Sequence, residues 1–503
     1  MLRFRPRTAA RTIAALLALL APLPVIATAG QATGAGPVTV SEDPRLVPGF
    51  DPTALDYAVR CHPGKPVALT FRASGATKVS VNGGPTRGGA FTAHVKLGPG
   101  RALTFSIDSG PDAGIFHVRC LPKNFPKYTA TLTGERQAEW YVMSVGYLGI
   151  RRPDYTRPDY VIVFDNHGVP VWWMHERHAL LFNASLLPNG HLAWYRYTHG
   201  LFGTDPRGGF SEHTLTGRHV RTYRAHGGPA DIHEFQMLPN RHVMLIRYKP
   251  RGHVDLSRYG KSKDSTVIDG QIQELTRRGR LVWKWSTKSH IPVADAARWL
   301  PLMNPVPLRD GRSAWDIAHL NTIDPHGERI LISLRHADAV YEIDKRSGKV
   351  LWKLGGRRTS KSLRVVGDPL ASTSFGGQHD ARLSSDGRFV TVFDNRSHRR
   401  NPPRAVLYEI DAAHRTATLV EAVTDHLVPD SPCCGSARKL PGGDWVMAWG
   451  HTPWITEQTA SGRPVFTLQF TNSLFMSYRA VPVLPGRLSR SKLRRGMDAM
   501  LTP

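Results

Sequence analysis

Acidic residues are scarce in this sequence relative to basic ones. Among its 503 residues, 66 are lysine or arginine and only 40 are aspartate or glutamate, which gives a formal net charge of +26. Such an excess of positive charge favours anionic partners. A sulfated or phosphorylated substrate, or an anionic cell envelope, fits this charge. The simpler alternative is a solvated basic surface that has no specific partner.

Long apolar runs are scarce as well. One run, at residues 13–26, follows four arginines and ends in Ala27-Thr28-Ala29, which is the pattern of a secretory signal peptide with an A-x-A cleavage site. We therefore predict a signal peptide at 1–29 and a small-residue linker at 30–41, and loss of the signal would lower the net charge to +22. Because no second run is long enough to span a bilayer, we expect a secreted, soluble protein. An exported protein with scattered positive charge is not expected to bind nucleic acid.

Cysteine is rare, with four residues in the whole chain. Cys61 and Cys120 stand at the ends of the first and last of several short alternating segments within 42–126, a pattern with glycine-rich turns that predicts a β-sandwich. In an oxidising compartment this pair is predicted to form a disulfide, worth on the order of 4 kcal/mol in the loop-entropy model. For the adjacent Cys433 and Cys434, the sequence does not decide between a vicinal disulfide and free thiols.

A repeated pattern occupies residues 127–485. A strand leads through a Pro, Gly, Asn or Asp turn to a second strand, and a further hairpin with a charged or glycine turn follows. First halves of the repeat stand at 186–192, 237–243, 323–330, 383–390 and 440–446. Second halves stand at 161–172, 215–218, 277–283, 341–352, 407–411 and 459–466. The second halves exceed the first halves by one, and 477–484 supplies the missing half if it joins the N-terminal repeat.

This pattern predicts an all-β fold in which a small β-sandwich precedes a six-bladed β-propeller closed by pairing of its two ends. A linear all-β array is the alternative, but it would leave sheet edges exposed. The last residues, 486–503, form a basic tail, for which an anionic cell envelope is a candidate partner.

Three histidines occupy one position of the repeat. Each lies six residues before the start of a turn: His233 before Pro239, His319 before Pro325 and His379 before Ser385. Equivalent positions in a propeller are related by rotation about its axis, so these imidazoles are predicted to face one another at the mouth or channel. A lone histidine is usually structural, but three in register favour a functional site. The fifth repeat has Gly435 at this position, so the ring of histidines is incomplete.

The residues near these histidines predict a cationic site that binds an anion. Arg335 lies on the strand after His319, while Arg247 and Asn395 occupy comparable places after the other two histidines. Such a site is rich in hydrogen-bond donors and can move protons near neutrality. Three histidines can also bind zinc, but the compact His-x-x-x-His spacing is missing and an adjacent arginine would repel the metal. The sequence contains neither a Gly-x-Ser-x-Gly elbow nor a phosphate-binding Gly-x-x-x-x-Gly-Lys loop.

Five motifs together resemble the aryl-sulfate sulfotransferases of bacteria, over roughly residues 141–484. The motifs are Asp231-Ile232-His233-Glu234, Trp315-Asp316-Ile317-Ala318-His319-Leu320-Asn321, Ser333-Leu334-Arg335-His336, Lys353-Leu354-Gly355-Gly356 and Gln378-His379-Asp380-Ala381-Arg382. The resemblance implies a six-bladed propeller that moves a sulfuryl group from an aryl sulfate to a phenolic acceptor, with no nucleotide donor and no cofactor. It also implies that His379 is the nucleophile, that His319 is the acid and base, and that His233, Asn321 and Arg335 bind the sulfuryl oxygens.

Elementary chemistry agrees with these roles. Sulfuryl transfer needs an in-line nucleophile, stabilisation of three equatorial oxygens and a proton for the leaving phenolate. A neutral imidazole can attack, and a second imidazole can give and recover the proton.

Two other functions stay open from the sequence. A noncatalytic propeller that binds sulfated or other anionic polymers is the first, because a fold alone implies no activity. A quinone-dependent dehydrogenase is the second, since the Gly-Lys-Val-Leu-Trp motif and the pair Cys433-Cys434 resemble features of those enzymes. Dehydrogenases of that class have eight blades and an acidic calcium site, whereas this chain has six repeats and a cluster of histidines and arginines.

Overall fold

The computed structural model describes residues 38–147, 159–176, 179–198, 205, 207–373 and 375–501. The predicted signal peptide and most of the linker lie outside these residues. The described chain is all-β, as the sequence predicts, apart from short 3-10 turns and one α-helix, α1 (Arg490–Ala499). No helix in this part of the chain is long and apolar enough to cross a membrane.

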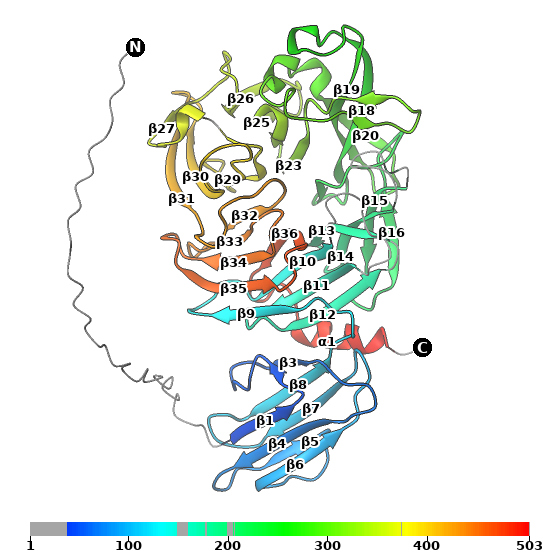
Figure 1. The fold of residues 1–503 in the computed structure, drawn as a ribbon, viewed down its shortest axis with the longest axis vertical. Coiled ribbons are helices and arrows are strands. Elements are labelled where there is room, and N and C mark those ends of the chain that lie inside the picture. Colours follow the sequence, from blue (N-terminus) through cyan, green and yellow to red (C-terminus); the bar gives the residue numbers. More distant parts are fainter. Residues whose placement is uncertain are drawn as a thin grey trace, which may run out of the picture.

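The first eight strands form two sheets, shown in blue in Figure 1. One sheet has the order β1 (Val38–Asp43), β4 (Val67–Ala73), β6 (Gly89–Val95), and the other has the order β2 (Leu46–Val47), β3 (Asp56–Val59), β8 (Gly114–Cys120), β7 (Ala102–Ile107), β5 (Val79–Val81). Alternate residues of β4 and β7 are buried, as expected of strands with one face on a core. Residues of both sheets, among them Phe71, Phe105 and Phe116, share one apolar core.

Cys61 and Cys120 form a disulfide at the end of β8, which confirms the predicted pairing. Cys433 and Cys434 are free thiols.

Six larger sheets follow in the described part of the chain, and Figure 1 shows them succeeding one another around the molecule in a propeller-like arrangement. The first three are β12 (Pro170–Glu176), β11 (Asp159–Asp165), β10 (Trp140–Tyr147), β36 (Phe475–Val483); β13 (Leu180–Leu186), β14 (Leu192–Tyr197), β15 (Gly209–His213), β16 (His219–Tyr223); and β17 (Phe235–Met237), β18 (Val243–Val254), β19 (Ser265–Leu275), β20 (Leu281–Ser286).

The fourth to sixth sheets continue this order. They are β23 (Leu320–His326), β24 (Arg329–Leu334), β25 (Ala339–Asp344), β26 (Val350–Gly355); β27 (Arg364–Val366), β31 (Thr416–Val423), β30 (Arg404–Asp411), β29 (Phe389–Asp394), β28 (His379–Leu383); and β32 (Ser436–Lys439), β33 (Trp445–Ala448), β34 (Trp454–Gln458), β35 (Pro464–Phe470), β9 (Tyr128–Leu132). A small hairpin of β21 (Val306–Pro307) and β22 (Ser313–Ala314) lies between the third and fourth sheets in the sequence.

Strands from the two ends of the chain close this arrangement. β36 pairs with β10, with Ala480 opposite Met143, as the repeat pattern predicts. β9 pairs with β35, with Leu132 opposite Phe466. Both pairings cover strand edges that would otherwise be exposed to other chains.

A set of buried charges, which we call the central ion network, joins all six sheets. It consists of Arg382, Arg438, Arg479, Glu234 and Asp380. Arg479 of β36 lies 3.0 Å from Glu234 and 3.3 Å from Asp380, and it donates to the main-chain oxygen of Asn321 at 2.9 Å and to the side chain of Asn183 at 3.3 Å. Asp380 belongs to the fifth sheet, Asn321 to the fourth and Asn183 to the second. Glu234 directly precedes the third sheet.

The two other arginines of the network share the same two carboxylates. Arg382 bridges Glu234 at 2.7 Å and Asp380 at 2.8 Å, and Arg438 of the sixth sheet binds Asp380 at 2.7 Å. Burial alone would raise the pKa of Asp380, but the three arginines overcome it and lower the pKa to about 2. The network therefore holds Asp380 ionised.

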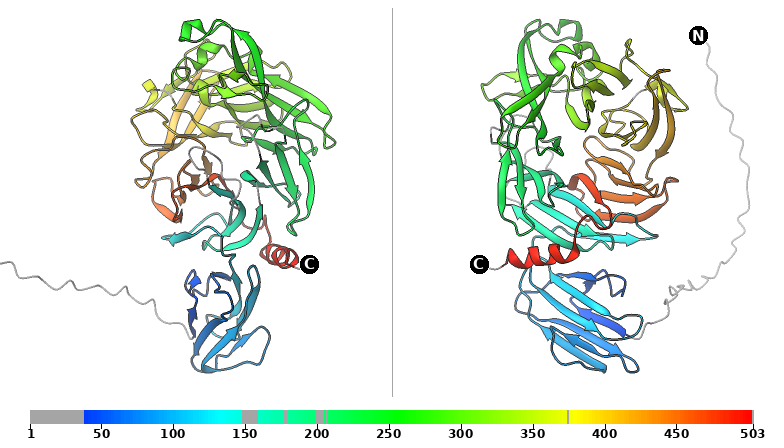
Figure 2. Two further views of the ribbon diagram at one scale, coloured as in Figure 1. Left: turned by 45° about the vertical axis from the view of Figure 1, so that its right-hand side comes forward. Right: turned by 180° about the vertical axis from the view of Figure 1, so that it is seen from behind.

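The C-terminal tail packs onto the protein through α1. Arg490 lies 2.5 Å from Asp56 and 3.1 Å from Asp165, and Arg494 lies 2.8 Å from Asp56. Leu493 is buried in the apolar core that contains Trp140, Trp172 and Phe466 of the larger sheets. Figure 2 shows α1 in red between the N-terminal sheets and the six larger sheets. Two arginines of the predicted basic tail are thus bound to aspartates within the chain.

We predict that Arg479→Ala will lower the free energy of unfolding by about 3–5 kcal/mol, because it leaves buried carboxylates without a partner. The matched control is Arg388→Ala, which removes an exposed ion pair with Glu409 and should cost at most about 1 kcal/mol. Urea unfolding followed by tryptophan fluorescence measures both changes. Equal losses in the two variants would show that the central ion network contributes no more to the free energy of unfolding than an exposed ion pair does.

Candidate active site

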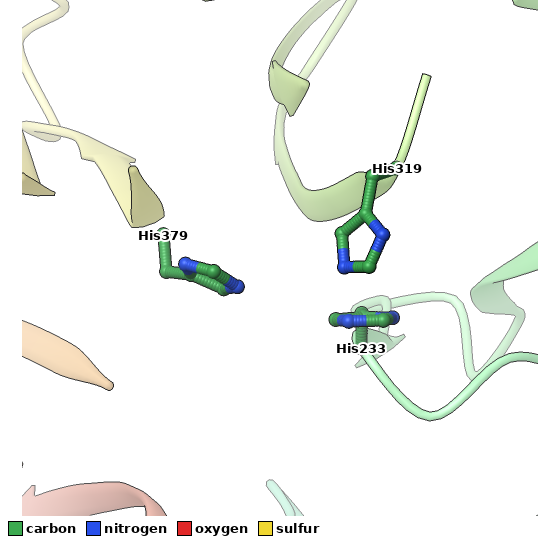
Figure 3. Close-up of side chains that lie close together, drawn as sticks. All are labelled: His233, His319 and His379. Carbon is green, nitrogen blue, oxygen red and sulfur yellow. The ribbon is translucent and has the colours of Figure 1, made fainter. Parts of the chain in front are cut away.

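The structure brings the three histidines in register together (Figure 3). His233 lies two residues before β17, His319 directly before β23, and His379 is the first residue of β28. The ring centroids of His233 and His319 are 4.7 Å apart, and that of His379 lies 6.3 Å from the former and 6.4 Å from the latter. Each histidine therefore lies at or just before the start of β17, β23 or β28, and these strands belong to three successive sheets.

Irregular backbone turns two of these side chains toward the centre. His319 has a left-handed φ of +49°, and the β23–β24 pairing shifts register between Leu320 and Thr322. Asp380, the residue after His379, has a φ of +52°, and the β28–β29 pairing shifts between His379 and Arg382. Such bulges redirect side chains and are common beside active sites.

Aspartates orient two of the three imidazoles. Nδ1 of His233 lies 2.5 Å from Asp231, and Nδ1 of His319 lies 2.6 Å from Asp316. A carboxylate accepts hydrogen bonds, so Nδ1 carries the hydrogen in both rings and the lone pair is left on Nε2.

A neutral amide orients the third imidazole. Nδ1 of His379 lies 2.8 Å from Oδ1 of Asn395 and 3.0 Å from the carbonyl oxygen of Gly377. Because a carbonyl oxygen only accepts, Nδ1 must be the donor and Nε2 of His379 keeps its lone pair. Burial, together with the charge of Arg335 and the nearby His233 and His319, lowers the pKa of His379 well below its ordinary value.

His319 is also held in its neutral form. Burial lowers its pKa well below the ordinary value, and the neighbouring His233 and Arg335 lower it further. The site therefore contains two uncharged imidazoles, His319 and His379, beside the permanent cation Arg335. An entering anion would relieve that excess of positive charge.

Arg335 supplies the cation. It begins the short helix η4 (Arg335–Ala337), donates to the carbonyl of Pro432 at 3.0 Å and to Nε2 of His336 at 2.7 Å, and stacks on Trp299 with its Cζ 4.2 Å from the ring centroid. Its Nε is buried and has no hydrogen-bond partner among the described residues. This N–H is available to an anionic ligand.

Asn321 and Arg247 have their own partners. Asn321 is fully buried, and its Nδ2 donates at 2.7 Å to the carbonyl oxygen of Gln378, the residue before His379. One amide hydrogen of Asn321 thus holds the start of β28, the strand of His379, and the other is not accounted for by this bond. Arg247, expected from its register to lie in the site, donates to the carbonyl of His226 at 3.0 Å.

Sequence reasoning assigned no role to several residues that line this site. Asp231 and Asp316 stand two and three positions before their histidines, a spacing that was visible in the motifs. Tyr248 and Tyr478 come from β18 and β36, and no local pattern marks them. The Tyr248 hydroxyl lies 3.4 Å from Nδ1 of His233, and the Tyr478 ring lies 5.8 Å from that of His233 and 6.5 Å from that of His379.

Two groups of described residues have the atoms to hold a metal ion. His233, His319 and His379 each offer a ring nitrogen within 4.8 Å of the others, and Asp316, His319 and His336 form a second such group. Hydrogen-bonded Nδ1 atoms are also typical of histidines that bind metals. The adjacent guanidinium of Arg335 opposes a dication and favours an anion.

Solved structures similar to this chain are distant. A protein of unknown function from Bacteroides caccae is 13% identical with a TM-score of 0.41, covering 69% of this chain and 99% of that one. A periplasmic gluconolactonase of Pseudomonas aeruginosa is 13% identical with a TM-score of 0.39, over 69% of this chain and all of that one. TolB from Acinetobacter baumannii is 11% identical with a TM-score of 0.39, covering 77% and 81%. No curated protein matches the chain.

A protein-family model described as arylsulfotransferase (ASST) matches residues 213–471. The match contains all three histidines together with Asn321 and Arg335, and it extends over half of the chain. It confirms the resemblance found in the sequence motifs. The chain therefore belongs to the arylsulfotransferase family.

Proposed function

We propose that this protein transfers a sulfuryl group from an aryl sulfate to a phenol through a sulfated His379. The observation that carries the proposal is the difference between the Nδ1 partners of the three histidines. His233 and His319 are bound to carboxylates, whereas His379 is bound to the neutral amide of Asn395. A carboxylate favours the protonated ring and suits an acid, while an amide favours the uncharged ring and suits a nucleophile.

In this proposal, His379 attacks the sulfur atom of the donor with its Nε2 lone pair. The new N–S bond forms as the bond between sulfur and the aryl oxygen breaks, and the ring keeps its Nδ1 hydrogen. The low pKa of His379 supports this role, because the ring needs no deprotonation before it attacks.

His319 gives a proton to the departing phenolate. The bound sulfate ester adds negative charge beside His319 and so raises its pKa. The ring therefore takes up a proton from solvent at Nε2 when the donor binds, and Asp316 stabilises the resulting imidazolium. In the second half-reaction the acceptor phenol returns a proton to His319 while its oxygen attacks sulfur and breaks the N–S bond. The two half-reactions leave the protein unchanged.

Arg335, His233 and Asn321 are proposed to bind the three sulfuryl oxygens. The unpaired Nε–H of Arg335 supports its role, and the buried setting strengthens each charge-assisted hydrogen bond. The resulting stabilisation acts on charge that spreads over the oxygens as the sulfuryl group moves.

The architecture that we propose for this function is a β-sandwich at 42–126 and a six-bladed β-propeller at 127–485. The six sheets and their closure by β36 and β9 support the blade count, and the shared core of the first two sheets supports the sandwich. We also propose that residues 1–29 direct secretion and that the disulfide suits an oxidising compartment.

Purified protein is predicted to consume a chromogenic nitrophenyl sulfate in the presence of a phenol, with no nucleotide, quinone or metal added. Exhaustive chelation should leave the rate unchanged, because the proposed donor carries the sulfuryl group itself. Release of nitrophenol measured by absorbance checks the result. Activity lost on chelation and restored by one metal would favour a zinc enzyme, and the absence of turnover with any aryl sulfate would favour a noncatalytic anion-binding protein.

Brief exposure to donor alone is predicted to leave one sulfuryl group on His379, and the full reaction should follow ping-pong kinetics. Digestion without acid followed by mass spectrometry locates the adduct. His379→Asn should abolish both half-reactions. Sulfate found on another residue, or an active His379→Asn enzyme, would contradict the assignment.

His319→Asn is predicted to slow donors with poor leaving groups by about 10²–10⁴-fold, the usual range for loss of a general acid. An activated nitrophenyl sulfate should lose far less, because an acidic phenol leaves without a proton. A plot of log kcat/KM against the pKa of the leaving phenol measures this difference. A slope equal to that of the unmodified enzyme would exclude His319 as the acid.

With an activated donor, kcat/KM is predicted to stay constant from pH 8 to pH 6. The reason is that the pKa of His379 lies well below 6.5, so the neutral nucleophile persists as the pH falls. A histidine with an ordinary pKa of about 6.5 would lose about fourfold of its neutral form between pH 8 and pH 6. A decline of that size in the pH profile would show that His379 is not held neutral.

A further inference from the structure

We propose that Asn395 is a positioning residue that fixes which nitrogen of His379 faces the substrate, and that the loop 431–434 fixes Asn395 in turn. The inference deepens the proposed function, since it rests on His379 as the nucleophile. Asn395 follows β29 and is fully buried, and it contacts the substrate only through His379.

The amide of Asn395 can adopt one orientation only. Its Nδ2 lies 2.9 Å from Oγ of Ser431 and 2.9 Å from the main-chain oxygen of Cys434, while its Oδ1 lies 2.8 Å from Nδ1 of His379. The oxygen of Cys434 only accepts, so the NH₂ group must face the loop and the amide oxygen must face the histidine. A flipped amide would place oxygen against oxygen.

This orientation determines the tautomer of His379. Two acceptors, Oδ1 of Asn395 and the carbonyl of Gly377, surround Nδ1. A lone pair on Nδ1 would meet both and leave two buried acceptors without a donor, which costs about 1–3 kcal/mol for each group. Nδ1 therefore keeps the hydrogen, and Nε2 keeps the lone pair.

The amide also keeps negative charge away from the nucleophile. The charged and titratable groups that face His379 are Arg335, His233 and His319, with the ring of Tyr478 at 6.5 Å. None of these supplies an anion, whereas His233 and His319 each have an aspartate on Nδ1. An aspartate at position 395 would favour the protonated, unreactive ring of His379.

The loop 431–434 holds Arg335 as well as Asn395. The carbonyl of Pro432 accepts from Nη2 of Arg335 at 3.0 Å and from Oγ of Ser397 at 3.0 Å. The loop 431–434 thus fixes both the tautomer of His379 and the position of Arg335, the proposed sulfate-binding residue.

This role also explains why the fifth repeat has no histidine. Gly435 has a φ of +95°, and a Cβ there would lie 2.5 Å from the ring of Phe393 and 2.7 Å from the carbonyl of Ala448. The loop passes where no side chain fits, so the backbone that supports Asn395 occupies the place of a fourth imidazole.

Two substitutions at Asn395 separate positioning from simple packing. Asn395→Asp has nearly the same shape but adds a charge, so the acid limb of kcat/KM for an activated donor should move to higher pH by at least about one unit. Asn395→Ala should lower kcat by about 10–100-fold, as expected for loss of a group that orients a reacting residue, with little change in KM and no upward shift of the acid limb. A pH profile of Asn395→Asp identical to that of the unmodified enzyme would overturn the proposal.

Asn240→Asp is the matched control. Oδ1 of Asn240 accepts a hydrogen bond from the backbone N–H of His242 at 2.9 Å on an exposed turn, and an aspartate keeps that acceptor while adding a charge. This variant should change neither kcat nor the pH profile. A similar shift in the control would show that added charge anywhere moves the acid limb, which would overturn the inference from Asn395.

The tautomer is measured without any turnover. In the full-length protein with ¹⁵N-labelled histidine, the unmodified His379 should give the spectrum of an Nδ1–H ring at neutral pH, and Asn395→Ala should give a mixture of tautomers. Ser431→Ala removes one of the two acceptors of Asn395 and should give a smaller change of the same kind. This variant replaces Asn395→Ala in the test if Asn395→Ala does not fold. An Nε2–H ring in the unmodified protein would refute the role of Asn395 even if aryl sulfates are consumed, whereas an Nδ1–H ring without turnover would refute only the proposed function.

Discussion

The buried arginines of the central ion network are the constraint on which the site depends. Glu234 directly follows His233, Asp380 directly follows His379, and the main-chain oxygen bound by Arg479 belongs to Asn321, two residues after His319. The ion pairs of Glu234 and Asp380 therefore hold the backbone directly after His233 and His379, and Arg479 holds the backbone just after His319. An unpaired charge at this depth would cost several kcal/mol, which leaves little freedom for any one strand to shift.

The electrostatic character of the site depends on where carboxylates lie, because the arginines of the central ion network pair with carboxylates and Arg335 does not in the described part of the chain. In the central ion network three guanidiniums pair with two carboxylates and lower the pKa of Asp380 to about 2. Around the nitrogen atoms of the histidines, in contrast, Arg335 has no described carboxylate within hydrogen-bonding distance, and it lowers the pKa of both His319 and His379. A sulfate ester would complete the charge balance that the fold leaves open at this point.

Periodicity made much of this arrangement predictable. Alternation of apolar residues indicated the strands, the repeat indicated that 477–484 joins the N-terminal repeat, and the register of the three histidines indicated their convergence. Each of these features depends on local pattern or on rotational equivalence. The disulfide between Cys61 and Cys120 followed from the ends of the strands and the expected compartment.

The features that escaped prediction involve residues far apart in the sequence. Asn395, which register placed near His379, also meets Cys434 across two sheets, and Arg479 reaches partners as distant as Asn183. No spacing rule links such residues, because each contact depends on how whole sheets pack. For the same reason, the sequence indicated a basic tail at 486–503 but not the aspartates, Asp56 and Asp165, that hold its helix.

The closure by β36 has a consequence for the order in which the protein is made. The ribosome synthesises β10 early and β36 near the end, yet the two share one sheet, and β36 carries the arginine that holds the strands behind the histidines. Contacts between such distant segments form late, since the intervening chain must first be complete. A nascent chain therefore has no assembled site, and a product truncated before Arg479 would lack the site entirely although all three histidines had been translated.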